Sequence, residues 1–202
     1  MFVFEGIDCS GKTTAINYVK EQLVNKGKNV VVLDDWAADP ELKYKLLTLD
    51  DPEEQVKIVL EARNKTKPIL EESKNSIILY DRYDLSTLVY QVLRWEKIRQ
   101  ARPSYDPNLL KKVLDSSDPY TLVYITPTEE FDRTKFLNKR SKKDKFDELD
   151  PYFKKKSYWY IMYFSKSLGI ELPEHYTIRN DGTNKFFEQL DRLVDVINTS
   201  VN

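Results

Sequence analysis

The first residues able to do chemistry stand near the start of the chain, in the segment Gly6-Ile7-Asp8-Cys9-Ser10-Gly11-Lys12-Thr13. This segment fits the pattern G-x-x-x-x-G-K-[ST] at every fixed position. Glycines allow the backbone to wrap around a phosphate, and successive N–H groups at the start of a helix bind anions. Lys12 can reach the β- and γ-phosphates, and the hydroxyl of Thr13 can ligate Mg²⁺. The segment therefore predicts a loop that binds a nucleoside triphosphate.

A second pair of candidate residues, Asp81 and Arg82, follows the apolar run 76–80. If that run is a parallel strand, its carboxyl end lies at the same edge of the sheet as the phosphate loop. An aspartate there can hold Mg²⁺ through water, and an arginine can bind a second phosphate. The simpler interpretation is a salt bridge at the strand end, but the phosphate loop makes the functional interpretation the stronger one.

Short β-rich runs that alternate with amphipathic stretches must position these residues. Strands are expected at 2–5, 29–33, 76–80, 120–126 and 176–179. Helices are expected at 12–26, 52–74, 85–98, 106–116, 128–140, 150–168 and 183–199. The first four strands are mostly continuous apolar runs, which is typical of strands buried on both faces. The pattern predicts an α/β fold in which helices cover both sides of a mainly parallel five-stranded sheet.

Length and composition narrow the class of protein. A chain of 202 residues fits one domain, residues 1–202, with a full core. The charges nearly cancel, with 32 basic and 33 acidic residues, which argues against nucleic acid and membranes as partners. The lysines between residues 139 and 156 are the one patch that could contact DNA. The single cysteine, Cys9, and the absence of a signal peptide or a long apolar stretch predict a soluble cytoplasmic protein.

Arg63 occupies an unusual position in the predicted helix 52–74. It shares a helical face with Val56, Val59 and Leu60. An arginine within an apolar stripe is costly unless it has a partner. The residues alone leave two interpretations open, an internal salt bridge and a donor that faces a ligand.

Three segments together resemble the thymidylate kinase family in order and spacing. They read FEGIDCSGKTT, LYDRYDLSTLVYQ and DKFDELDPYFKKKSYWY, and the resemblance extends over residues 2–164. The segment 81–91 is similar to the bacterial members. The resemblance implies the three-layer α/β/α P-loop nucleoside monophosphate kinase fold, with a helical lid here at about 133–149. It also implies an enzyme of dTTP biosynthesis that transfers the γ-phosphoryl group of ATP to dTMP, yielding dTDP, and that is usually a homodimer.

The resemblance assigns the phosphate loop and the end of the third strand to ATP and its metal. The residues implied for ATP binding are Gly6, Asp8, Ser10, Gly11, Lys12, Thr13, Thr14 and Arg133. Thr13 and Asp81 are the implied Mg²⁺ ligands. Mg²⁺ is thus the expected cofactor and ATP the expected phosphoryl donor.

The acceptor nucleotide is assigned to a second set of residues. The residues implied or proposed for it are Asp8, Asp35, Trp36, Arg63, Arg82, Ser86, Thr87, Tyr90 and Gln91. In the family, the loop acid matched by Asp8 contacts the 3′-hydroxyl of the sugar, and the arginine matched by Arg82 serves the acceptor phosphate. The arginine matched by Arg63 donates to the thymine carbonyl, so the ligand interpretation of Arg63 is favoured. Ser86 or Thr87, Tyr90 and Gln91 match positions around thymine and deoxyribose.

The predicted lid is rich in cations. Seven basic residues lie between residues 133 and 145. A basic run is usually a solvated surface, but phosphoryl transfer needs cations that close over the developing charge after the substrates bind. Residues 7–10 inside the phosphate loop are not basic, and bacterial family members carry the catalytic arginine in the lid. The resemblance therefore implies Arg140 as that arginine and Arg133 as the residue that packs on adenine. The expected catalytic residues are Lys12, Asp81, Arg82 and Arg140.

Two departures from the family pattern leave an alternative open. After the second strand the family has an arginine that binds the acceptor phosphate, whereas this chain has Asp34-Asp35-Trp36; a stacking phenylalanine is replaced by Val59. An acid at this position is typical of kinases that activate a hydroxyl acceptor by general base catalysis. The alternative function is a kinase for a deoxynucleoside, or for a hydroxymethylpyrimidine nucleotide or DNA, with Asp34 or Asp35 as the base. A nucleotide-binding protein without catalysis is a third interpretation, and the intact set of catalytic residues argues against it.

Overall fold

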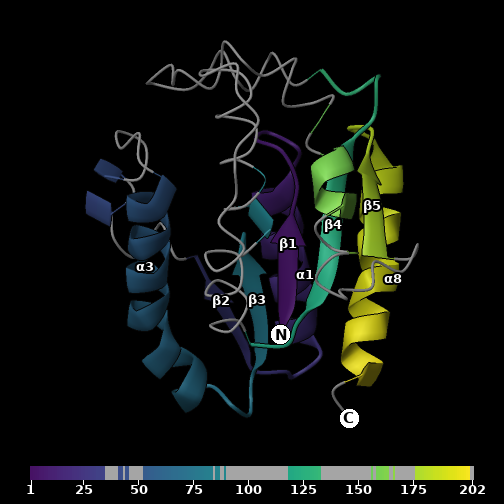
Figure 1. The fold of residues 1–202 in the computed structure, drawn as a ribbon. Helices are drawn as coiled ribbons and strands as arrows, with labels where there is room; N and C mark the ends of the chain where they lie inside the picture. The colour runs from purple at the N-terminus through teal and green to yellow at the C-terminus, as the bar shows by residue number, and fades with distance from the viewer. Residues whose placement is uncertain are drawn as a thin grey trace.

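The computed structural model of the chain describes residues 1–34, 41–42, 44–45, 52–83, 85–86, 89, 118–132, 156, 158–163, 166 and 176–200. Its strands form one five-stranded sheet (Figure 1): β1 (Phe2–Glu5), β2 (Val30–Leu33), β3 (Ile77–Asp81), β4 (Thr121–Pro127) and β5 (Thr177–Asn180). Their order across the sheet is β2-β3-β1-β4-β5, and every neighbouring pair is parallel. The predicted α/β fold is confirmed, and this sheet is parallel throughout rather than mainly parallel.

One face of the sheet is covered by two helices, α1 (Lys12–Asn25) and α8 (Asn184–Ser200), which lie behind the strands in Figure 1. Because side chains alternate along a strand, Phe2 and Phe4 of β1 point to the same face. They pack there with Ile16 of α1, Leu190 of α8 and other apolar side chains in the largest hydrophobic cluster of the described residues. This cluster anchors the phosphate loop, since α1 begins directly after it.

The opposite face is covered by α3 (Pro52–Glu72) and by a helical segment around residues 158–163. Val3, Ile78 and Tyr80 form a second buried cluster, and Leu70 of α3 packs against it. Beside β4, the ring of Tyr158 lies 5.8 Å from that of Tyr124. Helices therefore lie on both faces of the sheet, as predicted for a three-layer fold.

Two sequence-based predictions are wrong. The apolar run in β2 is only partly covered, and Val32 is 37% exposed, because β2 stands at the edge of the sheet. The helix expected over 128–140 does not begin at residue 128. The N–H of Thr128 donates to the carbonyl of Asn180 at 2.9 Å, and residues 128–132 form a turn instead.

Other predicted elements fall on positions that are not described. The helix at 106–116, the lid at 133–149 and most of the helix at 85–98 lie outside the described residues, although Leu85, Ser86 and Val89 are helical. Within the described part of the chain, none of the helices has the length and apolar character needed to cross a membrane.

Candidate active site

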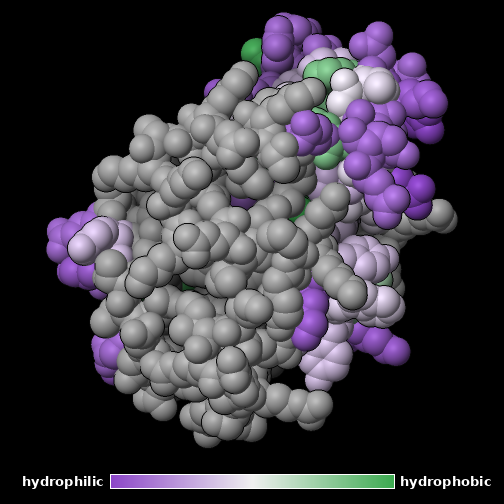
Figure 2. All heavy atoms as spheres, turned by 90° about the horizontal axis from the view of Figure 1, so that it is seen from above, coloured by the Kyte–Doolittle hydropathy of each residue, from purple (hydrophilic) through white to green (hydrophobic). Residues whose placement is uncertain are grey.

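The phosphate loop connects β1 to α1 at the edge where the strands end. Gly6 has φ 147° and Gly11 has φ 98°, a region that glycine adopts most readily. A Cβ on Gly6 would lie 2.2 Å from the carbonyl oxygen of Ile125, and one on Gly11 would lie 2.4 Å from Nδ2 of Asn180. The two glycines are therefore required by close approach as well as by φ. Figure 2 views the molecule from above, and the described side chains visible there are mostly hydrophilic.

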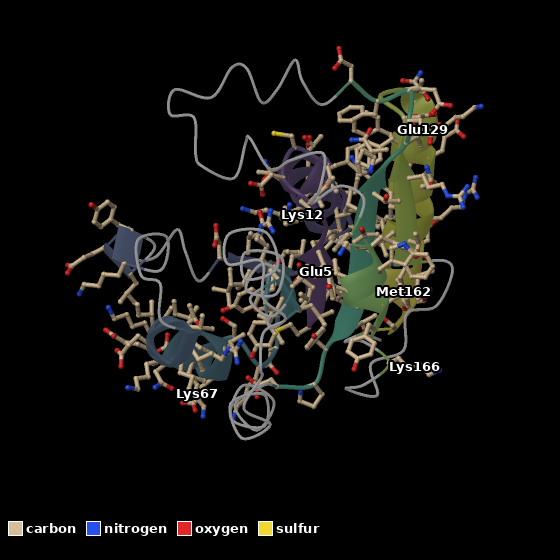
Figure 3. The ribbon with its side chains drawn as sticks, turned by 45° about the horizontal axis from the view of Figure 1, so that its top comes forward. Glu5, Lys12, Lys67, Glu129, Met162 and Lys166 are labelled. Carbon is tan, nitrogen blue, oxygen red and sulfur yellow. The ribbon has the colours of Figure 1, made fainter. Side chains whose placement is uncertain are left out.

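Lys12 lies inside the loop rather than in solvent. Its side chain is buried, and its Nζ donates to the carbonyls of Gly6 at 3.0 Å and Ile7 at 3.1 Å. Two effects lower the pKa of Lys12 to about 8: burial, which is the larger, and the positive charge of Arg82. Figure 3 labels Lys12 close to Glu5 of the central strand, while Lys67 lies on α3 away from them. Lys12 is thus held inside the loop that the sequence predicts to bind phosphate.

Thr13, in the first turn of α1, and Asp81, at the end of β3, lie close together beside the loop. β1 and β3 pair in a register that places Phe4 opposite Asp81, so Asp81 lies beside the phosphate loop. The hydroxyl of Thr13 donates to Oδ2 of Asp81 at 3.4 Å. A hydroxyl and a carboxylate are oxygen donors of the kind that Mg²⁺ prefers, and Mg²⁺ commonly completes its shell with water and substrate phosphates. The pair therefore fits the predicted metal site.

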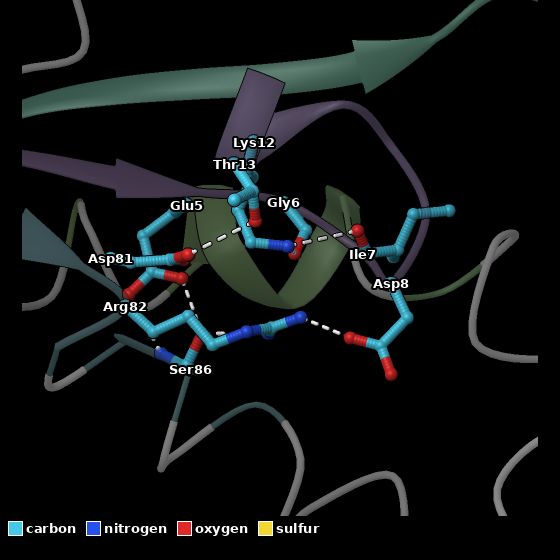
Figure 4. A network of polar contacts seen from close by, with 9 residues as sticks. All are labelled: Glu5, Gly6, Ile7, Asp8, Lys12, Thr13, Asp81, Arg82 and Ser86. Atoms are coloured by element: carbon cyan, nitrogen blue, oxygen red, sulfur yellow. Dashed lines mark hydrogen bonds and ion pairs between the residues drawn. The ribbon is translucent and has the colours of Figure 1, made fainter. Parts of the chain in front are cut away.

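Arg82 follows Asp81 and turns back toward the loop (Figure 4). Its φ of 68° is left-handed, which is uncommon for a residue with a side chain. Its Nη2 forms an ion pair with Oδ1 of Asp8, and its Nη1 donates to the hydroxyl of Ser86 at 3.2 Å. The guanidinium is mostly shielded, with 17% of the side chain exposed. The structure thus joins three predicted site residues in one network.

Glu5 is part of the same network and was not predicted from the sequence. Its carboxylate is fully buried, and it accepts hydrogen bonds from the backbone N–H groups of Tyr83 and Ser86 and from the hydroxyl of Ser86. Burial raises the pKa of Glu5, while these donors and the charge of Arg82 oppose the shift. An acid inside the otherwise apolar run Phe2-Val3-Phe4-Glu5 was the available signal, because a buried carboxylate needs partners.

Asn180, at the end of β5, is a second residue beside the phosphate loop that sequence reasoning missed. Its Nδ2 donates to the carbonyl of Ser10 at 2.8 Å, and its Oδ1 accepts from the N–H of Gly182 at 3.0 Å. It is buried and joins the phosphate loop to the turn before α8. The signal for it is weak, since a lone asparagine after a predicted strand has many uses.

Arg63, the arginine within the apolar stripe of α3, is buried. Its guanidinium lies over the ring of Tyr83 at 4.2 Å, a cation–π arrangement. Nearby, the hydroxyl of Thr66 lies 2.9 Å from that of Tyr80. An aromatic ring, which the sequence-based interpretations did not include, is therefore one partner of Arg63. Tyr83 also links this region to Arg82, its neighbour in the chain.

The remaining predicted residues divide into two groups. Ser10 is buried within the loop, and Thr14 is exposed on the first turn of α1. The predicted residues that lie outside the described part of the chain are Asp35, Trp36, Thr87, Tyr90, Gln91, Arg133 and Arg140. The described geometry therefore covers the phosphate loop and the Asp81-Arg82 tip, but not the lid.

Comparisons with known proteins agree on one family. A family model described as thymidylate kinase matches residues 4–164. A probable thymidylate kinase of Archaeoglobus fulgidus is 29% identical over 158 residues, which cover 74% of this chain and 75% of that protein. Thymidylate kinases of Thermoanaerobacter sp. strain X514 and Thermoanaerobacter pseudethanolicus are each 34% identical over 99 residues, covering 44% of this chain and 48% of each relative.

Proposed function

The chain belongs to the thymidylate kinase family, and we propose that the site described above transfers the γ-phosphoryl group of ATP in line to the phosphate of dTMP. As a member of the family it is a nucleotide phosphotransferase that uses ATP. A bond forms between an acceptor phosphate oxygen and the γ-phosphorus, and the bond from that phosphorus to ADP breaks. The products are dTDP and ADP. The attacking oxygen is already anionic, so the reaction requires no strong base.

The donor side of the reaction is assigned to the phosphate loop. Its N–H groups and Lys12 bind the β- and γ-phosphates, and the positive end of the α1 dipole favours their charge. Thr13 and Asp81 would hold Mg²⁺, which supplies charge neutralisation on the phosphates when it is bound. The hydrogen bonds from Lys12 to the loop carbonyls support this role, because a phosphate oxygen can replace those carbonyls as acceptor.

The acceptor side is assigned to Arg82, and one observation carries the proposal. The ion pair between Arg82 and Asp8 ties the arginine that follows β3 directly to the phosphate loop. A guanidinium has five N–H donors, so Arg82 can bind an acceptor phosphate while it keeps contacts with Asp8 and Ser86. Two phosphorylated ligands held from these two sides would have their reacting groups between the loop and Arg82.

Arg63, together with residues outside the described part of the chain, completes the proposal. Arg140 would stabilise the transition-state charge when the lid closes, and Arg133 would pack on adenine. Arg63, Thr87, Tyr90 and Gln91 would surround the thymine and deoxyribose. The burial of Arg63 against Tyr83 supports a fixed donor for the base, because a restrained guanidinium loses little freedom on binding.

An acceptor panel tests the function. Purified protein with MgATP is offered dTMP, dUMP, hydroxymethyl-dUMP, other deoxynucleoside monophosphates, thymidine and hydroxymethyluracil-containing DNA. The proposal predicts the highest kcat/KM with dTMP and formation of dTDP. Turnover of thymidine or DNA without turnover of any monophosphate would instead establish the hydroxyl-acceptor alternative.

Asp35→Asn provides the mechanistic control for that panel. A general base is needed for a hydroxyl acceptor but not for a phosphate acceptor. With dTMP as acceptor, the variant is expected to retain kcat within about threefold, since general base catalysis typically contributes at least a hundredfold where it is used. A loss of that larger size would place the acid in the chemistry and contradict the proposal.

Family membership also supports three further parts of the proposal, a single domain, a homodimer and a cytoplasmic location. Light scattering after size-exclusion chromatography should yield a mass of twice 23.9 kDa. A mass equal to one chain across a range of concentrations would contradict the dimer while leaving the chemistry unaffected.

A further inference from the structure

Glu5 is the last residue of β1 and lies immediately before the phosphate loop. One carboxylate oxygen, Oε1, accepts from the backbone N–H of Tyr83 at 2.9 Å and of Ser86 at 3.1 Å, and Oε2 accepts from the hydroxyl of Ser86. All three donors belong to the segment that follows β3. Glu5 therefore joins the strand before the loop to the segment that carries Arg82, across 81 positions of sequence for Ser86.

Arg82 depends on these contacts in two ways. Its backbone has a φ of 68°, which a residue with a Cβ adopts only when its surroundings impose it. Glu5 binds the N–H of the next residue, Tyr83, and so restrains that backbone. The side chain of Arg82 donates to the hydroxyl of Ser86, the same hydroxyl that donates to Glu5. Both ends of Arg82 are thus oriented from one buried carboxylate.

A carboxylate suits this role better than a neutral side chain of the same shape. It is an acceptor only, with lone pairs enough for three donors, whereas a glutamine would place an NH₂ group toward Ser86. The hydroxyl of Ser86 would then have to accept from both the glutamine and Arg82, and its own proton would lose its acceptor. The link from Ser86 to Arg82 would weaken although the volume and most of the packing are unchanged.

We infer that Glu5 is a positioning residue, which holds the Arg82 guanidinium in the orientation that receives the acceptor phosphate. This inference rests on the proposed function, because it assigns Arg82 to the acceptor. Glu5 itself touches no substrate in this account, since it is fully buried beneath the Arg82 turn. Its effect on catalysis is therefore expected to pass through Arg82 and to vanish without it.

A double-mutant cycle tests this dependence. Glu5→Gln should lower kcat/KM for dTMP by on the order of tenfold, while KM for ATP stays within about twofold. In an Arg82→Ala background, Glu5→Gln should change kcat/KM by less than about threefold, since the residue through which it acts is gone. An equal loss in both backgrounds would mean a merely structural role and overturns the inference.

Asn180→Ala is the matched control for the cycle. Asn180 is buried like Glu5 and also binds loop backbone, but its contacts are with Ser10 and Gly182 on the donor side. Its substitution should raise KM for ATP by the same factor with or without Arg82. If that factor differed between the two backgrounds, the loss of any buried polar side chain would affect Arg82. The inference of a specific role for Glu5 would then be wrong.

A crystal structure of Glu5→Gln separates this inference from the proposed function. The expected result is a displaced Arg82 side chain that no longer contacts Ser86, whatever the acceptor is. An Arg82 in its original position, with its contacts to Asp8 and Ser86 intact, overturns the inference even if dTMP is the substrate. A wild-type protein that does not phosphorylate dTMP contradicts the proposed function alone, and the crystal structure still decides the role of Glu5.

Discussion

The two sides of the site are held by different kinds of contact. On the donor side, the phosphate loop is shaped by glycines that approach the backbone of β4 and the side chain of Asn180, and Lys12 donates to loop carbonyls. On the acceptor side, Arg82 is held by the side chains of Asp8 and Ser86, with Glu5 behind them. The donor side thus depends mainly on backbone shape, and the acceptor side mainly on charged side chains.

This difference predicts how each side responds to change. A loop shaped by its backbone is disrupted when a side-chain atom is added to one of its glycines. The carbonyl that the new atom would contact cannot move unless a strand moves with it. A side-chain network fails when a charge or an acceptor is removed, because the buried partners lose their hydrogen bonds. Substitutions of the two kinds should therefore have different effects at the two sides.

Among the largest effects is the one expected from Gly6→Ala. The new methyl would lie 2.2 Å from the carbonyl oxygen of Ile125 at a φ of 147°, so β4 and the loop cannot both keep their positions. Displacement of the loop by about 1 Å is enough to lower kcat/KM on the order of a hundredfold, measured with ATP varied. Gly27→Ala is the control, because that glycine also has a positive φ of 77° but nothing lies within 4 Å of the added Cβ.

Gly27→Ala should cost about 1 kcal/mol in the free energy of unfolding, from the left-handed backbone alone. Its kcat/KM should match that of the wild type. Similar kinetic losses in the two variants would indicate that backbone strain, not the fit of the loop against β4, governs the donor side.

Lys12→Ala should lower kcat by on the order of a hundredfold or more, as expected for loss of a transition-state donor. The cation is removed from the donor side only, so KM for dTMP should change little. Steady-state kinetics with each substrate varied in turn makes the distinction. A variant with wild-type kcat would remove Lys12 from the mechanism.

The lowered pKa of Lys12 predicts two opposite trends with pH. In the unfolded chain the amine titrates near 10.5, and in the folded protein near 8. Between these values the unfolded chain binds more protons, so the contribution of Lys12 to the free energy of unfolding rises with pH. Over the same interval the folded protein loses the charge that binds phosphate, so its affinity for ATP should fall.

Lys12→Arg is the control for this prediction, because a guanidinium stays charged throughout the interval. Calorimetric titration with ATP from pH 7.5 to 9.5 should show a loss of affinity in the wild type that the variant lacks. Parallel curves for the two proteins would contradict the assigned titration of Lys12.

The smallest effect is expected away from both sides. Lys26, which follows α1, and Asp195 of α8 form an ion pair at 3.3 Å, with side chains 43% and 70% exposed. Exposed pairs contribute about 0–1 kcal/mol, so Lys26→Ala should shift Tm only slightly and leave kcat/KM unchanged. A marked kinetic loss would mean that the contact between α1 and α8 controls the phosphate loop.

The same difference explains what could be predicted from the sequence. The loop and all five strands were located to within one residue of their ends, because glycine spacing and apolar runs are local signals. Arg82 was found as the residue after a strand. The contacts of Glu5 and Asn180 could not be predicted in this way. Their hydrogen-bond partners Ser86 and Ser10 are 81 and 170 positions away, and these contacts depend on the order of the strands in the sheet.

The exposure of β2 was missed for a related reason. Its four apolar residues resemble those of a central strand, and nothing within them indicates an edge position. Arg63 was singled out from its place in an apolar helical stripe, and it is buried, but its contact with Tyr83 comes from a segment that lies beyond the helix. Local patterns thus locate elements, whereas contacts between elements determine the acceptor side.

Calorimetry on Arg82→Ala tests the central claim, that donor and acceptor phosphates are bound by separate cations on the two sides of Asp8. The account predicts that this variant binds a non-hydrolysable ATP analogue with near wild-type affinity. It should bind dTMP far more weakly and lose turnover by on the order of a hundredfold. Unchanged dTMP affinity and turnover would contradict this account, and so would an equal loss of affinity for both ligands.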